Sequence, residues 1–97
     1  MVARRAHTLA SVRAVTDPDN ETTEFAISVR PDQKGKGLGR LLMTRIIEYA
    51  RSRGTVWMIG EALRENVAMI TLAKACGFEI TPTEEPGIVG FRMKLQA

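Results

Sequence analysis

Apolar residues alternate with polar ones in the first third of the chain and recur every three or four residues further on. Thr8 to Thr16 carries Leu and Val in rough alternation, which predicts a strand with one solvated face. Asp17-Pro18-Asp19-Asn20 predicts a turn, because Pro and Asx residues set turn geometry. Thr22 to Arg30 predicts a second strand. Residues 8–30 are therefore expected to form an antiparallel hairpin.

A helical period begins at Leu38 and continues to about Arg53. Gly54 suits the end of this helix, and a mostly apolar strand, Val56 to Ile59, follows it. A strand, a helix and a strand at this spacing predict a right-handed βαβ unit, so the strands at 24–30 and 55–60 should be parallel. The expected buried stripe of the helix consists of Leu38, Leu41, Leu42, Ile46, Tyr49 and Ala50.

The last third predicts a second helix and a second hairpin. Asn66 is a suitable N-cap for a helix from Val67 to Cys76, and Gly77 suits the position after its end. Cys76 is interpreted as a small core residue, since no base or second thiol lies near it in sequence. The final strands are expected at Phe78 to Thr83 and Ile88 to Leu95.

The segment between the second strand and the first helix is rich in glycine. It reads Lys34-Gly35-Lys36-Gly37-Leu38-Gly39-Arg40. A strand that passes through such a loop into a helix directs free backbone N–H groups at one point, at the positive end of the helix dipole, which predicts a phosphate-binding loop. It is not a P-loop, since no Gly is followed by Lys and then Ser or Thr, and a dinucleotide fingerprint would need Gly in place of Arg40. From this segment alone, a tight strand-to-helix turn that binds no ligand is an alternative interpretation.

Composition narrows the class of protein. The chain of 97 residues suits one small domain, and 44% hydrophobic with 26% charged residues is ordinary for a globular protein. One cysteine excludes an internal disulfide and a multi-cysteine metal site, and no apolar run approaches the ~20 residues of a membrane span. We therefore expect a soluble, cytoplasmic protein without a metal. The net charge of +3 suits an anionic ligand, whereas scattered basic residues and few aromatics argue against nucleic acid.

Two segments resemble the motifs of the GNAT N-acetyltransferase superfamily. The glycine-rich loop resembles motif A, usually [QR]-x-x-G-x-[GA], with Lys34 at the Gln/Arg position and Gly37 and Gly39 at the small positions. Residues 66–78 resemble motif B, N-x-x-[A]-x-x-L-Y-x-K-x-G-F, through Asn66, Leu72, Gly77 and Phe78, with Lys74 one position before the Lys of the motif. The resemblance implies an α/β fold of the GNAT acyl-CoA N-acyltransferase type, a mixed β-sheet with flanking helices.

Within the superfamily the chain is most similar to the C-terminal domains of bacterial Pat-type protein lysine acetyltransferases. The shared phrases are Asp17-Pro18-Asp19-Asn20, Glu24-Phe25-Ala26-Ile27, Val29-Arg30-Pro31-Asp32 and Gly37-Leu38-Gly39-Arg40. There are two departures. Ala73 stands where motif B usually has a Tyr that protonates the departing thiolate, and the chain begins almost at the hairpin, so the N-terminal third of the usual domain is expected to be missing. A trimmed chain, or a site completed by another chain, would account for this.

The resemblance implies an acetyl-CoA-dependent enzyme that acetylates an amine, and the likeness to the Pat-type domains favours a protein lysine. The backbone of 34–40 would hold the pyrophosphate, Ile27, Ser28 and Val29 would pair with the pantetheine arm where the two parallel strands separate, and a backbone N–H there would stabilise the oxyanion. Asn66 could bind the pantetheine or serve only as the N-cap. Glu24 is the expected general base, with Glu61 and Glu65 in reserve.

Two other functions stay open, namely acetylation of a small-molecule amine and a catalytically silent acyl-CoA-binding module. The segment Thr8 to Thr16 is expected to be an uncovered edge strand, which favours a homodimer.

Overall fold

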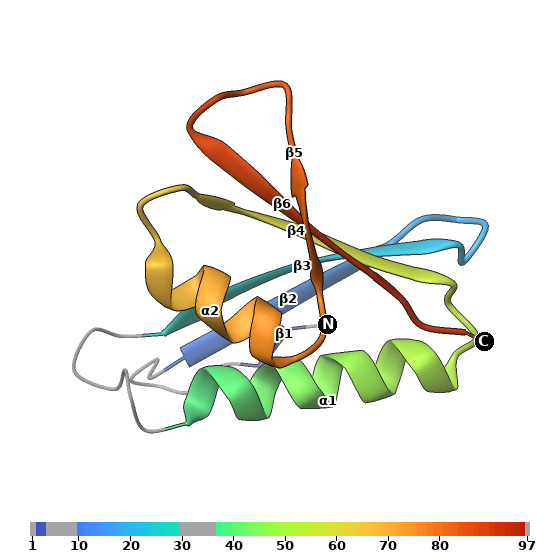
Figure 1. Ribbon diagram of the computed structural model, residues 1–97. Helices are drawn as coiled ribbons and strands as arrows, with labels where there is room; N and C mark the ends of the chain where they lie inside the picture. The colour runs from blue at the N-terminus through green and yellow to red at the C-terminus, as the bar shows by residue number, and fades with distance from the viewer. Residues whose placement is uncertain (1, 4–9, 30–36, 97) are drawn as a thin grey trace.

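The computed structural model describes residues 2–3, 10–29 and 37–96 (Figure 1). Its strands are β1 (Val2–Ala3), β2 (Ala10–Thr16), β3 (Thr22–Val29), β4 (Trp57–Leu63), β5 (Glu79–Pro82) and β6 (Ile88–Lys94). Its helices are α1 (Leu38–Ser52) and α2 (Val67–Ala75). The described strands form one mixed sheet in the order β1-β2-β3-β4-β6-β5. This arrangement confirms the predicted α/β fold with a mixed sheet and flanking helices.

The predicted first hairpin is present. β2 and β3 pair antiparallel from Ala10 opposite Val29 to Thr16 opposite Thr23. The turn between them is held by Asp17, whose carboxylate accepts a 2.8 Å hydrogen bond from the backbone N–H of Glu21. The expectation of an uncovered edge strand at Thr8 to Thr16 is wrong for part of that strand, because β1 pairs with β2 at Val12 and Arg13. Thr8, Leu9 and Arg30 lie outside the described residues.

Both helices cover the same face of the sheet. Met43, Ile46, Ile47 and Ala50 of α1 and Ala73 of α2 belong to one buried cluster with the sheet residues Val12, Phe25, Met58, Val89 and Phe91. Leu41 and Tyr49, expected in the core, are exposed. The buried stripe of α1 is therefore rotated relative to the predicted one. It includes Met43 and Ile47, which lie four residues apart on the same side of the helix.

The C-terminal half agrees with the predicted order of elements. Asn66 caps α2, and its side-chain oxygen accepts a 3.1 Å hydrogen bond from the backbone N–H of Met69. Gly77 follows the helix with a φ of 102°. β5 and β6 form the predicted antiparallel hairpin, and β6 also pairs antiparallel with β4 along the whole length of β4. The sheet thus has two three-stranded halves, β1-β2-β3 and β4-β6-β5.

Candidate functional site

The two halves of the sheet are joined at one end only. β3 and β4 are parallel, as predicted, but they pair only from Thr22 opposite Trp57 to Glu24 opposite Ile59. β3 then continues to Val29 beside β2, and β4 continues to Leu63 beside β6. Figure 1 shows β3 and β4 diverging toward the side of the molecule where both helices begin. We call this opening the splay, and the end where pairing stops, at Glu24 and Ile59, its apex.

Ile27, Ser28 and Val29 lie on β3 within the splay. In the described sheet they have β2 on one side and no β4 residue opposite them on the other. A strand with an unoccupied side presents backbone N–H and C=O groups to a ligand that can pair with it. Pairing of this kind with the pantetheine arm is what the sequence predicts for Ile27, Ser28 and Val29.

The N-terminus of α1 lies at the open end of β3 along the chain. Gly37 is the N-cap residue with a φ of 81°, no side chain among the described residues caps the helix, and its first turn holds no acidic residue. In the described part of the chain the first-turn N–H groups therefore have no side-chain acceptor, and the helix dipole would attract an anion to them. Leu38, Gly39 and Arg40 form this first turn. Lys34, Gly35 and Lys36, the other predicted phosphate-binding residues, lie outside the described residues.

Glu24 stands at the apex and is exposed. Its strand neighbours, Thr23 and Phe25, are buried on the helix-covered face, so Glu24 projects from the opposite face of the sheet. On that face it has Val15 of β2 and Ile59 of β4 beside it. The carboxylate is thus open to solvent at the point where the splay begins.

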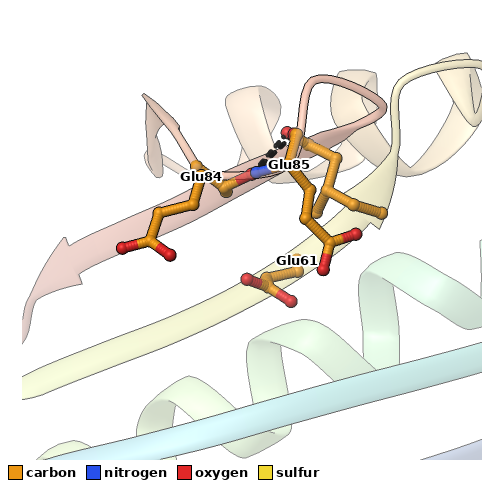
Figure 2. Close-up of a pocket in the computed structure, with 5 residues that line it drawn as sticks. Glu61, Glu84 and Glu85 are labelled. Atoms are coloured by element: carbon orange, nitrogen blue, oxygen red, sulfur yellow. Dashed lines mark hydrogen bonds between the residues drawn. The ribbon is translucent and has the colours of Figure 1, made fainter.

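Glu61 follows Ile59 on the same face of β4 and lines a surface cavity of about 260 Å³ with Thr83, Glu84, Glu85 and Ile88. Figure 2 shows the Glu85 side chain directed toward Glu61, whereas Glu84 extends along the other side of the turn. Thr83 shapes this turn, since its hydroxyl lies 2.9 Å from the carbonyl oxygens of both Glu85 and Ile88. In the sequence this segment indicates only a hairpin turn. The cavity could not be foreseen, because it needs the pairing of β6 with β4.

The reserve residue Glu65 lies beyond the end of β4, in the turn before Asn66, and it is exposed. It does not line the surface cavity that contains Glu61, Glu84 and Glu85. Asn66 uses its side-chain oxygen as the cap of α2, which leaves its amide nitrogen as a donor for a ligand.

Ala73 is completely buried in the core, so the position that carries a Tyr in motif B offers no proton donor here. One turn later, Cys76 is partly buried at the end of α2. Burial raises the pKa of the Cys76 thiol, and the Arg40 guanidinium lowers this pKa by a smaller amount. The thiol is therefore kept in its neutral form near neutral pH.

No group of three or more His, Cys, Asp or Glu side chains in the described part of the chain is placed to hold a metal ion. None of the described helices is long and apolar enough to cross a membrane.

Comparison with known proteins gives related sequences. The L-amino acid N-acyltransferase MnaT of Escherichia coli is 38% identical over 65 residues, which are 67% of this chain and 38% of that protein. The present chain thus spans well under half of the length of this relative.

Comparison with solved structures gives related folds. The GNAT domain of PAT from S. lividans superposes with a TM-score of 0.81 at 25% identity, over 95% of this chain and 57% of that one. The structure of yncA from Salmonella typhimurium with its cofactor acetyl-CoA has a TM-score of 0.79 at 26% identity, over 92% of this chain and 59% of that one. The model of the acetyltransferase (GNAT) family matches residues 3–78, most of the sequence, and this protein therefore belongs to that family.

Proposed function

We propose that this protein binds acetyl-CoA in the splay between β3 and β4 and transfers the acetyl group to the amine of a protein lysine. The observation that carries the proposal is the end of β3–β4 pairing at Glu24 and Ile59. From that apex an unpaired side of β3 leads toward the uncapped N-terminus of α1. Strand-like pairing for the amides of the pantetheine arm and free N–H groups for the pyrophosphate therefore follow each other along one path.

Each residue of the path has a defined task. Gly37 takes a left-handed conformation, and a Cβ at this position would meet no atom within 4 Å, so the helix start is open to a bulky anion. Backbone N–H groups of Ile27 to Val29 that point into the splay hold the amides, and one of them donates to the oxyanion. Asn66 adds its amide N–H at the start of α2.

Acetyl transfer needs a free amine, because an ammonium with a pKa of ~10.4 has no lone pair to attack with. Glu24 accepts the ammonium proton, and the amine nitrogen attacks the thioester carbonyl carbon. The nitrogen then loses a second proton to water as the carbon–sulfur bond breaks, which leaves a neutral amide. The exposed face around Glu24 leaves room for the acceptor to approach. Ala73 cannot protonate the departing thiolate, so this proton comes from water. A thiol with a pKa near ~8.5 is a tolerable leaving group without an acid.

The binding step is tested by titrating acetyl-CoA into the purified protein in a calorimeter. The Gly37→Glu variant places a carboxylate where the pyrophosphate should lie, and we expect it to lose binding. Gly54→Glu is the matched control, since Gly54 also has a φ of 81° and a Cβ there also meets no atom within 4 Å, but it lies at the other end of α1. Equal losses in both variants, or no binding by folded wild-type protein, would contradict the proposal.

The acceptor is tested by mass spectrometry. One peptide has a blocked N-terminus and a free lysine, a second has blocked lysines and a free N-terminus, and a free amino acid is the third substrate. A preference for the lysine peptide is the expected result. The similarity to an L-amino acid N-acyltransferase favours the amino acid as the second candidate. If the protein binds acetyl-CoA but neither transfers the acetyl group to an amine nor hydrolyses the thioester, the silent acyl-CoA-binding module is favoured. The absence of a proton donor at Ala73 supports this alternative.

A further inference from the structure

The apex of the splay is occupied from the core side by the ring of Phe25. Phe25 is the first residue of β3 beyond the last β3–β4 pair, and Gly60 is the corresponding residue of β4. A Cβ placed on Gly60 would lie 2.6 Å from both Cε1 and Cζ of Phe25. The ring therefore reaches from β3 across to the backbone of β4, just where the two strands separate.

The ring of Phe25 is held firmly in this place. Phe25 is only 5% exposed. Its ring centroid lies 5.2 Å from that of Phe78 and 6.3 Å from that of Phe91, so it packs against two other aromatic rings. A ring packed in this way at core density has no free volume into which it can turn.

We propose that Phe25 determines acyl-chain specificity, by closing the core side of the apex so that acetyl fits and longer acyl groups do not. The inference rests on the proposed function. If the pyrophosphate lies at the N-terminus of α1 and the pantetheine arm follows β3, the acyl group at the far end of the arm arrives at the apex.

Glu24 lies on the opposite face at the same point, and the acceptor amine needs that side. The space left for additional methylene groups is therefore the core side, which the Phe25 ring fills. Gly60 contributes by allowing the ring to lie against the β4 backbone.

The test compares dissociation constants of acetyl-CoA and butyryl-CoA, measured by calorimetry without an acceptor. Wild-type protein should bind acetyl-CoA more tightly than butyryl-CoA. Phe25→Leu should shift the ratio in favour of butyryl-CoA by roughly tenfold, since each methylene that gains an apolar site contributes about fourfold. Phe25→Met removes about as much volume as Phe25→Leu, but its unbranched, flexible side chain can fill part of the space that is opened. It should therefore shift the ratio in the same direction by a smaller factor, which keeps the test valid if the Leu variant does not fold.

Phe78→Leu is the matched control. It makes the same change in the same aromatic cluster, and the residue that a Gly60 Cβ would meet is Phe25 rather than Phe78. An equal shift in Phe78→Leu would overturn the inference, because it would reflect general loosening of the core. Tight binding of both ligands by all variants at an unchanged ratio would overturn it as well, while leaving acetyl-CoA binding intact. Failure of folded wild-type protein to bind either ligand would instead overturn the proposed function together with this inference.

Discussion

The buried hydroxyl of Thr55 donates a 2.6 Å hydrogen bond to the side-chain oxygen of Asn20, which lies 35 residues earlier. The amide nitrogen of Asn20 in turn donates to the carbonyl oxygen of Arg53 at 2.7 Å. Through these contacts the turn between β2 and β3 is joined to the link between α1 and β4. This junction holds the starts of β3 and β4 together at the closed end of the sheet, opposite the splay.

Replacing Asn20 should therefore destabilise the protein. Asn20→Ala leaves the Thr55 hydroxyl without its acceptor and places Ala at a φ of 56°, so we expect a loss of about 1–3 kcal/mol in the free energy of unfolding, measured in urea. Asn20→Asp keeps an oxygen for Thr55 and tolerates the left-handed conformation, and it should lose less. Equal stability of the Ala variant and wild type would show that the junction contributes nothing.

The contact between Gly60 and Phe25 gives a second stability prediction. Gly60→Ala forces the Phe25 ring from its place, and overpacking of this kind should cost about 1–3 kcal/mol. Gly87→Ala is the control, since a Cβ there meets no atom within 4 Å, and it should change stability by less than about 0.5 kcal/mol. The double variant Phe25→Leu/Gly60→Ala should lose less stability than the sum of the losses in the two single variants. Simple additivity in a double-mutant cycle would contradict the contact.

Glu24 is expected to act on catalysis rather than on binding. With an acceptor identified, Glu24→Gln should lower kcat by about 100-fold or more, because general-base catalysis typically contributes that much, while the affinity for acetyl-CoA measured by calorimetry stays the same. Glu61→Gln changes a residue of β4 that lies on the same face of the sheet as Glu24, and it should leave kcat nearly unchanged. A large loss in Glu61→Gln with little effect in Glu24→Gln would assign the base to Glu61 instead.

Asn66 has two separable roles. Asn66→Asp retains an oxygen for the Met69 N–H, and Asp is as good an N-cap as Asn, so stability should be retained. The variant lacks the amide N–H donors and brings a negative charge, so the affinity for acetyl-CoA should fall. Asn66→Ala should lose about 1 kcal/mol of stability as well. If Asn66→Asp binds acetyl-CoA as wild type does, Asn66 serves only as a cap.

Cys76 gives a prediction about pH. Burial raises the pKa of the thiol, so the pH profile of its alkylation by iodoacetamide, followed by mass spectrometry, should lie above that of a model peptide at about 8.5. Arg40→Ala removes the cation that lowers the pKa and should move the profile further up, whereas Arg45→Ala should not move it. Because the folded state holds this proton more tightly, the contribution to stability is complete below the pKa of the unfolded chain and is lost as pH rises through the folded pKa. A profile at or below that of the peptide would refute the assignment.

Much of the local structure could be predicted from short-range patterns. The turn at Asp17 to Asn20, the N-cap at Asn66 and the glycines after both helices act through backbone conformation and hydrogen bonds within a few residues, and the structure has them as expected. The buried stripe of α1 could not be predicted in full, because Leu41 and Met43 are both apolar and only packing against the sheet decides that Met43 is buried and Leu41 exposed.

The residue types at the candidate site could also be found in sequence, whereas their arrangement could not. Glu24 and the glycine-rich loop follow from local motifs. The cavity that Glu61 shares with Glu84 and Glu85 depends on β6 lying beside β4, a pairing between segments about thirty residues apart that no local pattern specifies.

The sequence by itself determined the order of strands and helices, the two hairpins and the glycine at the start of α1, because these depend on neighbouring residues. Only the tertiary structure decided where β3 and β4 stop pairing and what fills the apex. That point depends on the Phe25 ring meeting the bare backbone of Gly60 and on the support from Phe78 and Phe91, contacts between residues far apart in the chain. Such contacts form only when the core packs, so they belong to the fold and not to any single segment of the sequence.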